Sequence, residues 1–222
     1  MKEHFALLLF PDKVHQRSPD PGPFTDHRSY KAALQKEFQR KCVYCRISDG
    51  LKGYEGFGVD HYHPKKGTDD PDLVAAWGNL FYACNVCNSW KGKRKPTPEL
   101  YLPNPCAHPP SAGPMAEHLQ YHDAEVETRT RHGAWLSELL HLSERRELRE
   151  FVLSALGKFL AARVQALEIL GALEERRKTV GSGAEAAGIA RKLQDAQEKL
   201  AQANRGIERL TGEPVASVPH LS

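Results

Sequence analysis

The spacing of apolar residues predicts an amphipathic helix near the start of the chain. Tyr30, Leu34 and Phe38 recur every four positions, which places them on one helical face. Thr25 or Asp26 precedes them and is expected to be the N-cap. The preceding segment, 1–27, mixes prolines, histidines and charges, and is expected to be a tethered or poorly ordered arm, with a short strand possible at 5–10.

The next part of the chain predicts short strands and one further helix. Phe57–Tyr62 follows a glycine-rich loop and has the composition of a strand. A helix is expected to begin at the second cysteine pair, near Cys84, and to end at Pro96. Residues 96–134 are rich in proline and histidine, with a strand or hairpin near Glu117–Arg131. Strands and helices together predict an α+β fold.

The last part of the chain predicts two long helices. Apolar residues keep helical spacing from Leu136 to Glu175, with the proposed stripe at Leu153, Leu156, Leu160, Val164, Leu167 and Leu170. After a turn at 181–183, a second run steps by four and three residues alternately, at Ile189, Leu193, Ala196, Leu200, Ala203, Ile207 and Leu210. Such a heptad predicts an antiparallel, coiled-coil-like hairpin. The hairpin either packs on its own domain or serves dimerisation or partner docking.

Three regions therefore follow from the pattern: an arm at 1–27, a mixed domain at 28–134, and a helical hairpin at 135–222. No apolar run approaches the roughly 20 residues that cross a membrane. The run at 5–10 is too short for the core of a signal peptide. We therefore expect a cytoplasmic protein without membrane contact.

Charge is unevenly distributed along the chain. The net charge is only +3. Between Arg28 and Pro96, however, 13 lysines and arginines face 7 acidic residues, an excess of +6, so the remainder sums to −3. Such a segment attracts polyanions, which makes nucleic acid a candidate partner.

The same segment holds four of the five cysteines, in two CxxC pairs: Cys42 with Cys45, and Cys84 with Cys87. Thiolates at this spacing are the usual ligands of a tetrahedral structural zinc ion. A redox or disulfide role is the alternative, and it is disfavoured without an export signal. A shared Zn²⁺ would close the loop between the two pairs and fix whatever residues lie on it.

That loop carries the residues suited to hydrolysis. Asp60 and Asn88 offer hard oxygen ligands for Mg²⁺ or Mn²⁺. His61, with a pKa near working pH, can take a proton from water. Lys91 lies three residues after Asn88, on the same helical face, where it is expected to hold a phosphate.

These residues occur in a specific order: Cys42-x2-Cys45, Val59-Asp60-His61-x2-Pro64, Gly78-Asn79-Leu80 and Cys84-x2-Cys87-Asn88-x2-Lys91. The run resembles the HNH endonucleases, which have a ββα-metal fold. More narrowly, DHYHPKK followed by WGNLFYACNVCNSWKGKR resembles HNH proteins of Septu-type bacterial anti-phage systems. The similarity covers about 55 residues, roughly a quarter of the chain.

The resemblance implies a metal-dependent endonuclease that nicks or cuts DNA. It makes His61 the general base, Asp60 and Asn88 the ligands of the catalytic ion, and Asn79 a structural residue that orients His61. Many HNH proteins carry histidine at the position of Asn88, so metal binding is expected to be weaker here. The resemblance also implies an antiviral role and an ATPase partner, with the helical hairpin as the docking element.

Some questions remain open at this level. His63, Lys65 and Lys93 are further candidate phosphate contacts, although His63 also fits an ordinary surface histidine or a metal ligand. Cys106 and His108 form an incomplete ligand pair in a proline-rich turn. The alternative function is a zinc-stabilised nucleic-acid or protein-binding module without catalysis.

Overall fold

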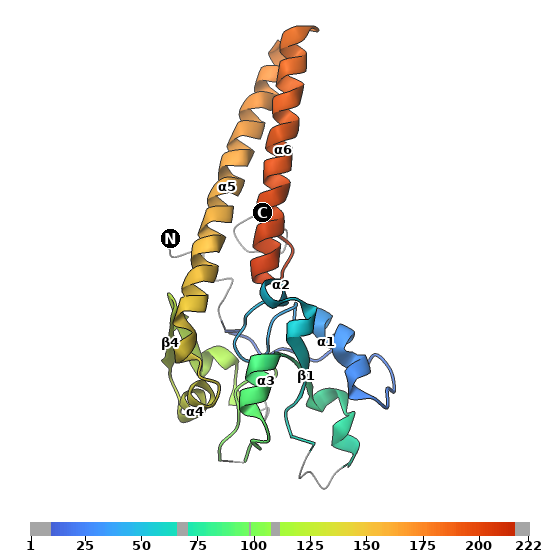
Figure 1. Ribbon diagram of the computed structural model, residues 1–222, viewed down its shortest axis with the longest axis vertical. Coiled ribbons are helices and arrows are strands. Elements are labelled where there is room, and N and C mark those ends of the chain that lie inside the picture. The colour runs from blue at the N-terminus through green and yellow to red at the C-terminus, as the bar shows by residue number, and fades with distance from the viewer. Residues whose placement is uncertain (1–9, 66–70, 98, 108–111, 216–222) are drawn as a thin grey trace.

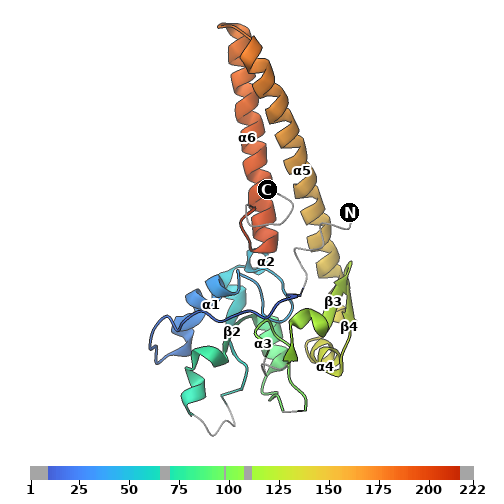
Figure 2. The same cartoon turned by 180° about the vertical axis from the view of Figure 1, so that it is seen from behind.

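The chain folds into an α+β body from which two long helices project side by side as an arm (Figures 1 and 2). The computed structural model describes residues 10–65, 71–97, 99–107 and 112–215. The α+β prediction is confirmed, as is the C-terminal pair of helices. The helices and strands are α1 (Lys31–Glu37), α2 (Asp49–Lys52), β1 (Phe57–His61), β2 (Leu80–Cys84), α3 (Asn85–Lys91), β3 (Leu119–His122), β4 (Glu125–Thr128), α4 (Arg131–Leu139), α5 (Arg146–Thr179) and α6 (Ala184–Thr211).

The first predicted helix forms as a short 3-10 turn, His27–Tyr30, followed by α1. Asp26 is its N-cap, because its Oδ1 accepts a hydrogen bond from the Arg28 amide. The apolar residues that suggested the helix, Tyr30, Leu34 and Phe38, are all buried. The four-residue spacing thus identified the face that packs on the core.

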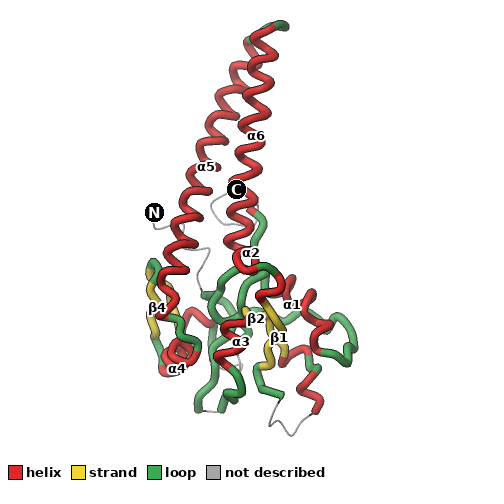
Figure 3. Tube along the Cα trace, viewed as in Figure 1, coloured by secondary structure: helices red, strands yellow, loops and turns green. Residues whose placement is uncertain are grey.

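The β1 and β2 strands lie side by side (Figure 3). They pair antiparallel, with Asp60 opposite Phe81 and His61 opposite Leu80. The α3 helix follows β2 without a loop and packs against both strands. It ends at Gly92, earlier than the predicted end at Pro96. The backbone of Gly92 has φ +53°, a conformation that glycine adopts without strain and that terminates the helix.

The region before the arm differs from the prediction of one continuous helix from residue 136. α4 ends at Leu139, and a 3-10 turn at Ser143–Arg145 separates it from α5. Leu136, Leu140 and Leu142 are completely buried in the main core. Residues 135–142 therefore pack with the body, and the hairpin itself begins near residue 146.

The α5 and α6 helices run antiparallel and pack along most of their length. The heptad predicted for α6 is confirmed, since six of its seven positions are buried: Ile189, Leu193, Ala196, Ala203, Ile207 and Leu210. The stripe predicted for α5 is correct only near the body. Leu156 and Leu160 are buried, whereas Val164 and Leu167 are 51% and 41% exposed. Two consecutive four-residue steps, each about 40° more than a full turn, place Val164 about 80° around the helix from Leu156.

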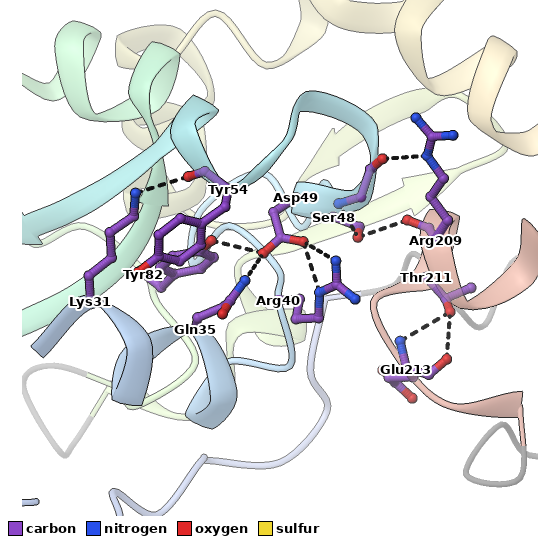
Figure 4. A network of polar contacts seen from close by, with 11 residues as sticks. Lys31, Gln35, Arg40, Ser48, Asp49, Tyr54, Tyr82, Arg209, Thr211 and Glu213 are labelled. Carbon is purple, nitrogen blue, oxygen red and sulfur yellow. Dashed lines mark hydrogen bonds and ion pairs between the residues drawn. The ribbon is translucent and has the colours of Figure 1, made fainter. Parts of the chain in front are cut away.

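The foot of α6 contacts the body very closely at α2. A Cβ added to Gly50 would lie 2.2 Å from the carbonyl oxygen of Arg209, so only glycine fits there. Ser48 donates a hydrogen bond to the same carbonyl, and Arg209 donates one to the Gly50 carbonyl (Figure 4). Beside this contact, the buried carboxylate of Asp49 accepts from Gln35, Arg40 and Tyr82. The base of the arm is therefore joined to the body by specific polar contacts.

The described part of the N-terminal arm is tethered to the body. Glu37 accepts hydrogen bonds from His15, Arg17 and Ser18. Trp77 donates its indole N–H to the carbonyl of Ser18. The strand considered at 5–10 lies, apart from its last residue, outside the described residues.

None of the helices in the described ranges combines the length and apolar character needed to cross a membrane.

Candidate functional site

Four cysteine sulfurs meet inside the body. Cys42 and Cys45 lie in the turn after α1, Cys84 ends β2, and Cys87 lies in the first turn of α3. All four are buried, and their sulfurs lie within 4.8 Å of one another. The Cys45 and Cys84 sulfurs are 3.9 Å apart. A tetrahedral ion with Zn–S bonds of 2.3 Å would separate them by about 3.8 Å. This cluster could hold a metal such as zinc.

Two arginines, Arg145 and Arg46, lie beside the cluster. The Nη1 of Arg145 lies 3.5 Å from the Cys87 sulfur and 4.0 Å from the Cys84 sulfur, and the guanidinium stacks on Trp90. Burial disfavours its charge, but the nearby thiolates outweigh that effect and raise the pKa of Arg145. Four thiolates around a divalent ion carry a net charge of −2. Arg145 and the buried Arg46 are placed to offset it.

Asp60 lies at the centre of a buried hydrogen-bond network. Its side chain is only 3% exposed. One carboxylate oxygen accepts from the Tyr44 hydroxyl at 2.6 Å, and the other lies 3.2 Å from the Lys91 ammonium. Burial, and then the neighbouring carboxylate, raise the pKa of Tyr44 well above its usual value, so the hydroxyl stays a donor. Asp60 is thus an ion-paired carboxylate with both oxygens occupied.

Lys91 differs from its sequence-based prediction as a phosphate contact. Its side chain is fully buried. Besides Asp60, the ammonium donates to the carbonyl of His61 at 2.5 Å. The predicted helical face was correct, but that face packs on β1. In this arrangement the ammonium cannot reach a phosphate from solvent.

His61 and Asp60 are adjacent residues of β1, so their side chains point to opposite faces of the β1–β2 pair. Its Nε2 lies 2.9 Å from the Val74 carbonyl oxygen. A carbonyl only accepts, so Nε2 carries the proton and the lone pair of the neutral ring is on Nδ1. Burial lowers the pKa of His61, although the bond to Val74 opposes this. The ring of His27 lies 4.8 Å away, centroid to centroid.

Asn79 fixes the loop that follows β1. Its Oδ1 accepts from the His63 amide at 2.8 Å, while its Nδ2 donates to the carbonyls of His63 and Leu73. The side chain is 5% exposed. One amide thereby joins both sides of the loop carrying His61 and Val74. Asn79 therefore holds the backbone close to His61 in place.

Asn88 lies against the face of β1 that carries Asp60. A Cβ added to Gly58, two residues before Asp60, would lie 3.7 Å from the Asn88 amide nitrogen. Strand alternation places Gly58 and Asp60 on one side, so Asn88 shares that side and His61 does not.

The remaining predicted contacts lie nearer the surface. Lys93 and His63 are exposed, and burial followed by the charges of Lys91 and Lys95 lowers the pKa of His63. Lys65 is hydrogen-bonded to the ring of His27. Cys106 is half-buried, and burial raises its pKa to about 12. His108 lies outside the described residues.

Three residues of this region were missed by the sequence reasoning: Tyr44, His27 and Arg145. Tyr44 sits inside the first CxxC pair, where only the cysteines attracted attention. His27 and Arg145 are distant in sequence from the motifs. Folding places His27 beside His61 and Arg145 beside Cys87. No spacing rule connects them to the site.

The chain matches no known family model, no curated protein and no solved structure.

Proposed function

We propose that this chain is an HNH-type endonuclease that hydrolyses DNA phosphodiester bonds, with His61 as the general base. The proposal rests on the order of its motifs and on one observation: the Nε2–H of His61 is held by the Val74 carbonyl, which leaves Nδ1 as the basic atom. The lowered pKa keeps this ring neutral at neutral pH. A neutral imidazole in a fixed tautomer suits removal of a proton from an attacking water.

Asn79 supports this role as a positioning residue. It holds the backbone on both sides of the loop that separates His61 from Val74. The neighbouring basic segment would attract the phosphate backbone, with Lys93 and Lys65 in more accessible places than Lys91.

The zinc part of the proposal is structural. Zn²⁺ would be held by four thiolates, those of Cys42, Cys45, Cys84 and Cys87. Their coordination bonds would join the turn after α1 to the β2–α3 junction. The ion would make no contact with substrate, because all four sulfurs are buried.

The second, catalytic ion expected by resemblance, Mg²⁺ or Mn²⁺, does not fit the site as it is folded. Asp60 has no free side of its carboxylate toward solvent, and the Lys91 ammonium already supplies the positive charge beside it. We therefore assign no catalytic step to such an ion. A requirement for it would mean that Lys91 moves away from Asp60.

The same ion pair favours a second candidate function, a zinc-stabilised module that binds DNA without cleaving it. A carboxylate permanently paired with a buried lysine is a structural element and needs no catalytic role. The two proposals differ in whether the protein cleaves DNA and whether that cleavage needs His61.

A plasmid-nicking assay separates the two functions. The full chain is tested without divalent ions and with Mg²⁺, Mn²⁺ or Ca²⁺, beside His61→Ala and the matched control His63→Ala. The nuclease proposal expects nicking that His61→Ala lowers about 100-fold or more and that His63→Ala largely retains. DNA binding without nicking under all conditions would establish the binding module instead.

The defence role and the ATPase partner remain proposals from resemblance. They predict that a co-expressed ATPase of the same genetic neighbourhood is retained by the full chain on a column. Retention would have to be lost when the helical hairpin, from residue 146 onward, is deleted. This deletion spares Arg145 and the buried leucines of residues 136–142, which belong to the body.

A further inference from the structure

One side of the arm is hollowed from its base as far as Ile169. Two adjoining hollows of about 370 Å³ and 730 Å³ lie between α5 and α6 and share Phe159 and Gln202. The larger begins beside Leu51 at the body, and the smaller extends to Ile169 on the outer arm. We call the pair the arm groove.

The floor of the arm groove is an apolar stripe on α5. It consists of Phe151, Ala155, Phe159, Ala162, Ala166 and Ile169. These positions follow steps of four and three residues, so they lie on one face of the helix. Phe151 is 61% exposed and Ile169 is 39% exposed, at opposite ends of the stripe. From Phe151 to Ile169 the stripe rises through 18 residue steps, which is about 27 Å of helix.

This stripe is distinct from the one that packs against α6. The buried face of α5 carries Val152, Leu156 and Leu160. A Cβ added to Gly206 would lie 2.5 Å from the Phe159 ring, so the absence of a side chain at Gly206 lets α6 accept this ring. The groove is thus a second apolar face of the arm, formed where α6 presents its smallest residue.

The rim of the arm groove carries charge of one sign. Its charged lining residues are Lys158, Lys199, Arg205 and Arg209. None of the residues that line the two hollows, all within the described part of the chain, is acidic. Lys199 also pairs with Asp195 at 2.7 Å, but both side chains are more than 60% exposed, so that pair is weak.

We propose that the arm groove binds an acidic amphipathic helix of a partner protein. About five turns of helix would match the length of the stripe. Its apolar face would cover Phe151 and Ile169, and its flanking aspartates and glutamates would meet the four basic residues of the rim. Insertion of an amphipathic helix into an apolar groove is a common mode of protein recognition. The apolar residues that enter the groove are spaced three or four positions apart along the helix.

The charges argue against two other occupants. A second copy of this arm, packed about a two-fold axis, would place four basic residues against the same four. A nucleic acid would satisfy the basic rim but set phosphates against the exposed Phe151 and Ile169. An acidic helix satisfies the rim and the floor together.

The test uses two synthetic 18-residue helical peptides with the same leucine face. One has glutamates on its flanks and the other has lysines. Binding of each fluorescent peptide to the full-length protein is measured by anisotropy at low and high salt. We expect the acidic peptide to bind at least about tenfold more tightly than the basic one, and its affinity to fall with salt.

Three pairs of variants locate the contact. Phe151→Asp and Ile169→Asp should each weaken the acidic peptide about tenfold or more, because they place a like charge on an apolar anchor. Val164→Asp and Leu167→Asp, similarly exposed on α5 but outside the groove, should leave binding unchanged. Lys158→Glu with Arg205→Glu should reverse the preference between the two peptides.

Equal binding of both peptides, no binding of the acidic one, or equal effects of groove and control variants would overturn the proposal. Sedimentation of the protein alone is the remaining arm of the test. A dimer that Phe151→Asp alone dissociates would assign the groove to self-association and overturn the acidic partner.

Discussion

The pair formed by Asp60 and Lys91 is the most consequential contact at the scale of single residues. Neither side chain has appreciable contact with solvent, and each is the other's counter-charge. Removing one partner from such a pair leaves a buried charge uncompensated, which costs more than the pair itself contributes. The Tyr44 hydroxyl alone would then face the carboxylate.

Lys91→Met should therefore destabilise the fold by about 3–5 kcal/mol. Urea unfolding, monitored by near-ultraviolet circular dichroism, measures the change. The double variant Asp60→Asn with Lys91→Met should recover a large part of the loss, because it removes the unpaired charge. A single variant as stable as the parent would show that Asp60 has another cation in solution.

Lys91 also shows which features of the site the sequence could not predict. The spacing of the cysteines predicted their cluster, because two CxxC pairs carry their geometry in the sequence. The spacing of Lys91 from Asn88 gave the correct face of α3 but not what lies opposite that face. Whether a lysine on a helix meets solvent or a buried carboxylate depends on packing, and Asp60 is 31 positions away.

At the scale of elements, the contact between α2 and α6 depends on a glycine. A Cβ on Gly50 would overlap the backbone of Arg209, which cannot move without lifting α6 from the body. Gly50→Ala should cost about 1–3 kcal/mol, as overpacking does. Gly188→Ala in α6 has open space and should stabilise by about 1 kcal/mol, through helix propensity. Thermal unfolding of both variants checks the contrast.

The N-terminal arm is held by an acid-sensitive contact at Glu37. Burial opposes ionisation, but hydrogen bonds from His15 and Ser18 and the charge of Arg17 outweigh it and lower the pKa of Glu37. A carboxyl group with a lower pKa in the folded state contributes stability above its unfolded pKa, near 4.3, and loses it as pH falls through the folded value.

Glu37→Gln should reduce stability at pH 7 and weaken the dependence of stability on pH below about 4.3. Denaturant midpoints between neutral and acidic pH measure both effects. Glu55→Gln, a change at an exposed side chain in the same part of the body, is the control. Parallel curves for parent and Glu37→Gln would mean that the arm is held by other contacts.

The two arm helices show which patterns predict packing. In α6 the regular alternation of three and four residues keeps apolar positions on one line, and the buried residues follow it. In α5 two apolar faces share one helix: one packs on α6, and the other lines the arm groove. The predicted stripe follows the packed face only at Leu156 and Leu160, and beyond them Val164 and Leu167 lie on neither face.

At the scale of the whole molecule, the cysteine cluster connects parts that are far apart in the chain. It joins the turn after α1 to the β2–α3 junction, and Arg145 extends the contact to the base of α5. The body beneath the arm would lose both connections together if a bound metal were removed. The arm, with helices of 34 and 28 residues and contacts of its own, depends less on that centre.

Removal of metal should therefore unfold the body before the arm. A zinc chelator, or Cys42→Ser, is expected to abolish near-ultraviolet circular dichroism while part of the helical far-ultraviolet signal persists, since structural zinc contributes on the order of 10 kcal/mol to folding. Elemental analysis should give one zinc per chain in the parent and none in Cys42→Ser. Cys106→Ser, which alters the cysteine outside the cluster, should retain both the zinc and the signal. If the chelated protein unfolds at the same denaturant concentration as the parent, the four thiols hold the body together without metal.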